Sequence, residues 1–275
     1  MFPFHVRLGP FALSPGEIFA TLGVAIAAWI CRRRMAGLGV STGLLVDLGL
    51  GTLLGGAVGA RLYYILPLWI RGAASTGEIV SSWSDGSGYY GGFIGGSIAV
   101  ASILRFKKIP ILPALDAIAA VIPLGFAVGK IGCFLSGCCY GRLWASGVAF
   151  RAGSLCWQTQ RGEGVIPLDA TTCLPVHPTQ LYELALGLAL FVLLAALQRR
   201  VRTPGVIYLA YILGYGAWRF AIEFFRSDPG RHGFGAGPLS DSQVTSIVLG
   251  LAAAAGLVFL ATKKSAETAT PDRNN

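Results

Sequence analysis

Long apolar runs constrain this chain more than any other feature. Several of them approach the ~20 consecutive residues that a helix needs to cross the hydrocarbon core of a bilayer. Of the 275 residues, 54% are hydrophobic and only 13% are charged, whereas a soluble domain carries about twice that charged fraction. The runs therefore predict an all-α polytopic integral membrane protein rather than one or two soluble domains.

We expect about seven spanning helices in a single transmembrane domain that covers residues 1–265. Neither a basic segment nor a small-residue cleavage site precedes the first run, so that run is expected to act as an uncleaved signal anchor. A long outer loop is expected at 136–179 and a disordered cytoplasmic tail at 266–275. The expected spans are Leu13–Ile30, Val46–Ile70, Tyr90–Leu104, Ile111–Leu135, Gln180–Leu197, Gly205–Phe225 and Gln243–Thr262.

The 22 basic residues are distributed unevenly among the expected loops. Clusters follow the first, third, fifth and seventh spans, at 32–34, 105–108, 199–202 and 263–264. Short loops rich in lysine and arginine mark the cytoplasmic side of a membrane. The alternation predicts an N-out, C-in topology, and it explains the net charge of +9 without a nucleic-acid partner.

Three cations, Arg61, Lys130 and Arg219, fall inside expected spans. A cation at the centre of a bilayer costs at least about 2.5 kcal/mol on insertion scales, so each requires a partner or a water-filled cavity. The i, i+4 spacing of Arg219 and Glu223 predicts one salt bridge, which would not neutralise all three. Since arginine and lysine both bind phosphate, we expect a site for an anionic lipid headgroup.

Five motifs occur along the chain and together cover most of its length. They are GARLYY at 59–64, YGGFIGG at 90–96, GKIGCFLSGCCYGR at 129–142, HPTQLYE at 177–183 and GYGAWRFAIEFFR at 214–226. Each motif is weak alone, but the five in this order resemble the prolipoprotein diacylglyceryl transferase family. The resemblance implies an enzyme of the bacterial cytoplasmic (inner) membrane that needs no cofactor or metal.

The resemblance also implies the reaction and its partners. Family members move a diacylglyceryl group from phosphatidylglycerol to the thiol of a lipobox cysteine in a secreted prolipoprotein, and release glycerol-1-phosphate. Arg219 matches the essential arginine of the family. The other positions that match family motifs or flank them, and that we expect to bind substrate, are Arg61, Tyr64, Gly141, His177, Tyr182, Tyr215 and Glu223.

The central motif departs from the family pattern, which reads approximately GRxGNFxNxExYG. Lys130 replaces the arginine, Cys133 and Ser136 replace the two asparagines, and Cys138 replaces the glutamate. Tyr90 stands where the family usually has a histidine. The scaffold is therefore kept while the polar site is altered, as in a distinct branch of the family.

The implied chemistry is displacement at a glycerol carbon by a thiolate, with a phosphate as the leaving group. Preorganised positive charge would stabilise that phosphate, and we assign this role to Arg219 and Lys130 with Arg61 in support. The thiol must lose its proton before it attacks. Tyr90 and Lys130 are the candidates for this transfer; His177 is a third, whose loop position favours a structural role.

The cysteines allow several interpretations. Three interpretations fit Cys133, Cys138 and Cys139: a small-residue helix junction, a thiol-redox site, or a nucleophile for a covalent lipid intermediate. A zinc site is disfavoured, because no further cysteine or histidine completes it nearby. Cys156 and Cys173 share the outer loop, where the oxidising compartment favours a disulfide.

A rival hypothesis keeps the fold and changes the function. A divergent paralogue could bind anionic phospholipid, or perform thiol-redox chemistry, without lipoprotein transferase activity. Paired glycines near Gly55 and Gly91 do not favour a phosphate-binding loop, because no Walker lysine or strand accompanies them. We expect these glycines to be helix-packing faces.

Overall fold

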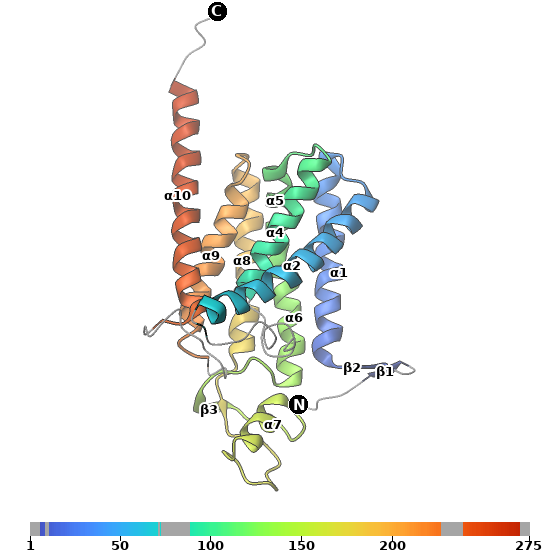
Figure 1. Ribbon diagram of the computed structural model, residues 1–275, viewed down its shortest axis with the longest axis vertical. Coiled ribbons are helices and arrows are strands. Elements are labelled where there is room, and N and C mark those ends of the chain that lie inside the picture. Colours follow the sequence, from blue (N-terminus) through green and yellow to red (C-terminus); the bar gives the residue numbers. More distant parts are fainter. Residues whose placement is uncertain (1–5, 9–10, 71, 73–88, 227–238, 270–275) are drawn as a thin grey trace, which may run out of the picture.

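A computed structural model of the chain describes residues 6–8, 11–70, 72, 89–226 and 239–269. Long helices form a bundle, and the short strands and helix α7 lie at or beyond one end of it (Figure 1). The elements are β1 (Val6–Leu8), β2 (Phe11–Leu13), α1 (Pro15–Met35), a 3-10 turn (Ala36–Leu38), α2 (Thr42–Ile70), α4 (Tyr89–Phe106), α5 (Ile111–Ala119), α6 (Ile122–Ser136), β3 (Leu143–Val148), α7 (Leu155–Gly162), α8 (Thr179–Arg200), α9 (Val206–Ile222) and α10 (Asp241–Ala269).

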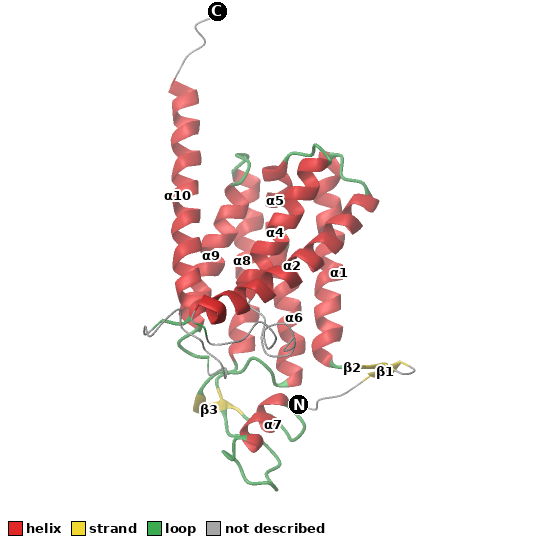
Figure 2. Cartoon of the chain, viewed as in Figure 1, coloured by secondary structure: helices red, strands yellow, loops and turns green. Residues whose placement is uncertain are grey.

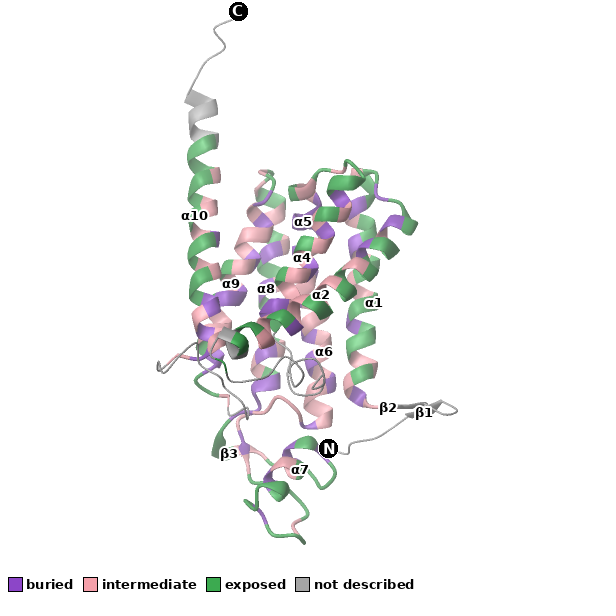
Figure 3. Cartoon of the chain, in the orientation of Figure 1, coloured by how far each residue is buried: buried purple, intermediate pink, exposed green. Residues whose placement is uncertain are grey.

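The helices have the length and surface of a multi-pass membrane protein. Within the described residues, five helical segments are long and apolar enough to cross a bilayer, and α9 is a shorter apolar helix. Large apolar side chains such as Leu54 (70% exposed) and Leu251 (68% exposed) point away from the protein core, and exposed positions follow the outer faces of the helices (Figure 3). The mostly helical architecture is as predicted. The expected spans Tyr90–Leu104 and Gly205–Phe225 correspond to α4 and α9, which are not among the five segments.

Two helix boundaries differ from the sequence prediction. The expected span Ile111–Leu135 is interrupted at 120–121 and consists of α5 followed by α6. Pro123 lies in the first turn of α6, where a missing N–H is tolerated because that turn has no intrahelical acceptor. At the other end of the chain, α10 continues through Ala269, so the start of the expected tail is helical and residues 270–275 lie outside the described part.

Short strands make the expectation of an all-α chain wrong in detail (Figure 2). β1 and β2 form an antiparallel hairpin, and β3 lies in the segment between α6 and α8. Leu13, expected to begin the first span, belongs to β2. The helix starts at Pro15 because Ser14 and Glu17 form a capping box, in which Ser14 Oγ accepts from Glu17 N at 3.3 Å and Glu17 Oε2 accepts from Ser14 N at 2.6 Å.

Glycines bring α2 and α4 into backbone contact, as the sequence predicted. A Cβ atom added at Gly91 would lie 2.3 Å from the carbonyl oxygen of Gly59, and one added at Gly95 would lie 2.2 Å from that of Gly55. Each helix thus presents two small residues four positions apart, a spacing that lets helix backbones approach closely in membranes. Tyr90 directly precedes Gly91 near the start of α4. The helix contact therefore also fixes the position of Tyr90.

We predict that Gly59→Ala destabilises the protein by about 1–3 kcal/mol, the usual effect of overpacking a close contact. The added Cβ would lie 2.3 Å from the Gly91 carbonyl oxygen. Gly49→Ala on the same helix is the matched control, since nothing lies within 4 Å of its Cβ and both changes gain the same helix propensity. Thermal unfolding in one detergent measures the difference, and equal midpoints for the two variants would contradict the contact.

Candidate active site

A carboxylate between two cations lies where α6, α8 and the end of α9 meet. Lys130 Nζ on α6 is 2.5 Å from Glu183 Oε2 on α8, and Arg226 Nη1 is 3.5 Å from Glu183 Oε1. The Glu183 side chain is only 3% exposed. One negative charge facing two positive charges leaves this cluster with a surplus positive charge at the protein interior.

Sequence reasoning missed the pairing role of two of these residues. The sequence patterns identify neither Arg226 nor Glu183 as a site residue; both occur only within the motifs at 214–226 and 177–183. The available signal was the position of Glu183 in the HPTQLYE motif, one turn into a helix whose start faces the expected outer side. The partner of Glu183 could not be read from spacing, because Lys130 lies on a different helix.

The segment after α6 is fixed to the neighbouring helices by backbone hydrogen bonds. Gly141 N donates to His177 O at 2.9 Å, and Arg142 N donates to Phe225 O at 2.8 Å. A Cβ atom at Gly141 would lie 2.4 Å from the Phe225 carbonyl oxygen, so a glycine is required for this packing. Binding of substrate by Gly141 stays a prediction; its observed role is to join this segment to the ends of α8 and α9.

The predicted pairing of Arg219 with Glu223 is confirmed. Arg219 Nη1 donates to Glu223 Oε2, and Arg219 Nη2 donates to Ser242 Oγ at 3.0 Å. Glu223 is buried. These contacts orient the guanidinium between α9 and the first turn of α10.

Other predicted site residues approach the same end of α10. The Tyr90 hydroxyl of α4 hydrogen-bonds Ser246 Oγ at 2.6 Å, one helical turn beyond the serine that contacts Arg219. On α2, the Arg61 guanidinium is buried and lies 5.6 Å from the ring centre of Tyr64. The neighbouring Tyr63 hydroxyl is 2.7 Å from Thr245 Oγ1, so α2, α4 and α9 all meet α10 here.

An aromatic cluster connects the two charged groups. The Tyr215 ring lies 6.0 Å from the Tyr90 ring and 5.9 Å from the Phe126 ring. The Lys130 ammonium lies 4.9 Å from the centre of the Phe126 ring. The three residues assigned to catalysis, Arg219, Lys130 and Tyr90, are therefore arranged around one set of packed aromatic rings.

His177 is enclosed by aromatic rings outside this cluster. It stacks on Trp144 with ring centres 4.5 Å apart and an interplanar angle of 6°. Its Nδ1 lies 3.3 Å from the Tyr182 hydroxyl, and the Phe225 ring is 5.3 Å away. This packing agrees with the structural role that the loop position of His177 suggested.

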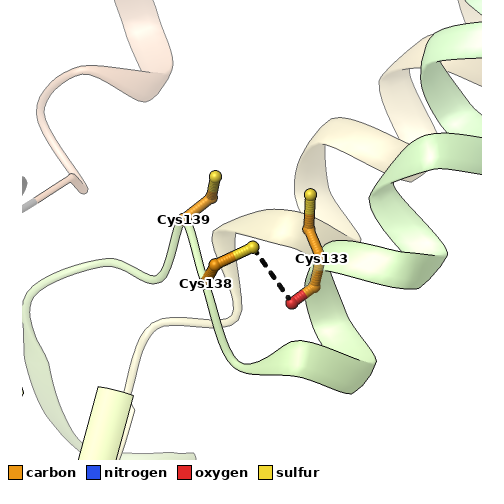
Figure 4. Close-up of side chains that lie close together, drawn as sticks. All are labelled: Cys133, Cys138 and Cys139. Carbon is orange, nitrogen blue, oxygen red and sulfur yellow. Dashed lines mark hydrogen bonds between the residues drawn. The ribbon is translucent and has the colours of Figure 1, made fainter. Parts of the chain in front are cut away.

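Cys133, Cys138 and Cys139 form a compact thiol cluster at the end of α6 (Figure 4). Their sulfur atoms all lie within 4.8 Å of one another, and Cys138 Sγ donates to the Cys133 carbonyl oxygen at 3.6 Å. Hydrogen bonds from the other two thiols lower the pKa of Cys139, and the charges of Lys130 and Arg226 lower it further. This geometry is compatible with both a helix-packing junction and a reactive thiol site.

Cys156 and Cys173 meet in the segment that carries β3 and α7. Their sulfur atoms are 2.8 Å apart and both residues are buried beside Phe150 and Val176. The pKa of Cys173 is lowered to about 7, and the largest cause is the hydrogen bond from Cys156. Because the thiolate is the species that reacts in disulfide formation, this pair is well placed for oxidation.

We predict a Cys156–Cys173 disulfide in the protein isolated from cells. Such a bond would close a loop between residues 17 positions apart and stabilise the folded segment by about 3 kcal/mol. Alkylation of the unfolded, non-reduced protein followed by mass spectrometry should leave these two cysteines unlabelled, whereas Cys31 should be labelled. Labelling of both Cys156 and Cys173 would contradict the prediction.

Comparison with known proteins identifies similar sequences over nearly the whole chain. Residues 3–259 match the sequence family described as prolipoprotein diacylglyceryl transferase. Three relatives are named phosphatidylglycerol–prolipoprotein diacylglyceryl transferase. The one from Geobacter sulfurreducens is 31% identical over 273 residues, covering 95% of this chain and 96% of the relative. The one from Bordetella parapertussis is 33% identical over 270 residues (94% and 95%), and that from Proteus mirabilis is 29% identical over 288 residues (98% and 94%).

Proposed function

The chain belongs to the prolipoprotein diacylglyceryl transferase family, and we propose that it performs the reaction for which its relatives are named. The protein would transfer a diacylglyceryl group from phosphatidylglycerol to the lipobox cysteine of a secreted prolipoprotein. Glycerol-1-phosphate is the second product. This transfer is the first step of lipoprotein maturation.

The buried Lys130–Glu183–Arg226 cluster is the observation that carries this proposal. Glu183 faces both cations, so the cluster retains one positive charge. The phosphodiester of phosphatidylglycerol carries one negative charge, and a charge-assisted hydrogen bond in a protein interior is stronger than one between neutral groups. Lys130 therefore stabilises the phosphate as it leaves.

Arg219 is the second phosphate-binding group of the proposed site. A guanidinium carries five N–H donors, and the contacts with Glu223 and Ser242 leave further donors for a phosphate oxygen. Arg61, on α2, adds positive charge for binding the same phosphate. Tyr90 or Lys130 moves the proton of the incoming thiol.

The proposed enzyme crosses the bacterial cytoplasmic (inner) membrane about seven times, with the N-terminus outside and the C-terminus inside. The basic clusters at 32–34, 105–108 and 199–202 support this topology, since all lie at the C-terminal ends of helices that run from the site end of the bundle (Figure 1). Short basic loops stay in the cytoplasm. The site then opens toward the outer leaflet, where secreted prolipoproteins emerge.

Rescue of a bacterial strain depleted of its own transferase tests this function in cells. We expect the wild-type chain to restore growth and lipoprotein modification, and Arg219→Ala to fail at the same expression level. A paralogue that only binds lipid or exchanges thiols would give no rescue. Failure of the wild-type chain, when it is present in the membrane at normal amounts, would contradict the proposed activity.

A further inference from the structure

We propose that Cys133, Cys138 and Cys139 bind a Zn²⁺ ion through three thiolates and leave its fourth position open for the acceptor thiol. The three sulfur atoms already lie within 4.8 Å of one another. A Zn–S bond of about 2.3 Å in tetrahedral geometry places thiolates roughly 3.8 Å apart. Small side-chain rotations would therefore close the cluster around one ion. The zinc site itself is independent of the proposed function; the role of the open position rests on it.

The backbone holds the three side chains together without the ion. Gly137 ends α6 with a φ of 69°, and Cys139 has a φ of 55°, so the chain reverses direction and returns over Cys133. Thr179 Oγ1 donates to the Cys139 carbonyl oxygen at 2.6 Å, and Gln180 Nε2 donates to the Cys138 carbonyl oxygen at 2.6 Å. The start of α8 thus fixes a turn in which the cysteine side chains lie close to one another (Figure 4).

The number of ligands indicates a reactive site rather than a structural one. In the described part of the chain, no histidine, further cysteine or carboxylate joins the three sulfur atoms within the same distance of one another. Structural zinc sites close with four protein ligands, whereas catalytic sites use three and keep one position open. This proposal departs from the sequence expectation, which disfavoured zinc because a fourth protein ligand is missing; an open site does not need that ligand.

The surrounding charge also matches this ion. Three thiolates and one Zn²⁺ carry a net charge of about −1. Lys130 precedes Cys133 by three residues, on the same face of α6, and Lys130 and Arg226 both act electrostatically on Cys139. With Glu183 between them, these groups carry a net charge of +1, opposite in sign to the zinc–thiolate centre.

The open position would promote loss of the proton from the acceptor thiol, which the reaction requires. A thiol that coordinates Zn²⁺ is deprotonated, so the acceptor cysteine releases its proton to solvent when it binds. The resulting thiolate forms a C–S bond to the glycerol carbon. The C–O bond to the phosphate breaks, and its electron pair leaves on the phosphate oxygen of glycerol-1-phosphate. No oxidant or reductant is needed.

Cobalt substitution tests the metal site without relying on activity. Full-length protein in detergent, reduced and stripped of metal, is titrated with Co²⁺, which occupies the same tetrahedral sites. We expect one equivalent to bind with a thiolate-to-cobalt charge-transfer band. Serine at any of the three positions should weaken binding more than about 100-fold, beyond what the loss of an outer-shell partner costs, whereas Cys31→Ser should not. Absence of the band in the wild type, or its persistence in the triple serine variant, would overturn the proposal.

The acceptor role has its own readout. Adding a lipobox peptide should shift the visible cobalt bands, and the same peptide with serine in place of cysteine should not; no shift with the cysteine peptide overturns this role. Full product formation by the metal-free protein would overturn the acceptor role of the metal and leave the transferase function intact. Cobalt binding with a peptide-dependent shift, but no lipidated peptide from the zinc-loaded protein, would support the site and contradict the transferase function.

Discussion

Arg219→Ala should reduce diacylglyceryl transfer by about 1,000-fold or more, because it removes a preorganised cation from the leaving phosphate. The arginine is held between Glu223 and Ser242, so its geometry is set before substrate binds. Arg219→Lys keeps the charge and loses the planar fork that recognises phosphate. We therefore expect the lysine variant to be intermediate in rate.

Initial rates of peptide lipidation, measured with equal amounts of folded protein, give this comparison. Arg199→Ala is the matched control, since it removes an arginine from the last turn of α8, in a basic cluster that has no assigned part in the reaction. Activity of Arg219→Ala within a few-fold of the wild type would remove Arg219 from the proposed chemistry.

Lys130→Met should lower the rate by about 100- to 1,000-fold, the usual effect of losing one group that stabilises developing negative charge. It should also destabilise the fold, because breaking a buried ion pair costs about 3–5 kcal/mol and Glu183 is almost fully buried. Lys130→Arg should keep most of the activity, since the family pattern has arginine at this position.

A double variant separates catalysis from stability. In Lys130→Met, Glu183 keeps only its longer contact with Arg226, at 3.5 Å. Adding Glu183→Gln removes this weakly compensated buried charge but also takes the carboxylate from Arg226, so the unfolding temperature should recover in part toward the wild-type value. The rate should stay low, because the cation is still missing. Recovery of both the unfolding temperature and the rate would show that Lys130 acts only through the stability of the fold.

The sequence predicted the features that depend on local patterns. Apolar runs indicated the helices, the i, i+4 spacing indicated the Arg219–Glu223 pair, and paired glycines indicated helix-packing faces near Gly55 and Gly91. Each of these signals lies within one helix, where residue spacing fixes which side chains share a face.

The remaining features depend on how separate elements meet. The Lys130–Glu183 pair joins α6 to α8, and no spacing in the sequence connects those two residues. The break between α5 and α6 was hidden by continuous hydropathy. The thiol cluster requires the positive φ angle of Cys139, which non-glycine residues adopt rarely, so the sequence could offer it only as one of several interpretations.

The mass of a lipobox peptide incubated with the purified protein and phosphatidylglycerol vesicles measures the proposed transfer itself. We expect a gain equal to one diacylglyceryl group on the cysteine, release of glycerol-1-phosphate, and no gain on a peptide with serine at that position. An unchanged cysteine peptide, with folded wild-type protein and with phosphatidylglycerol and other anionic donors each supplied in turn, would contradict it.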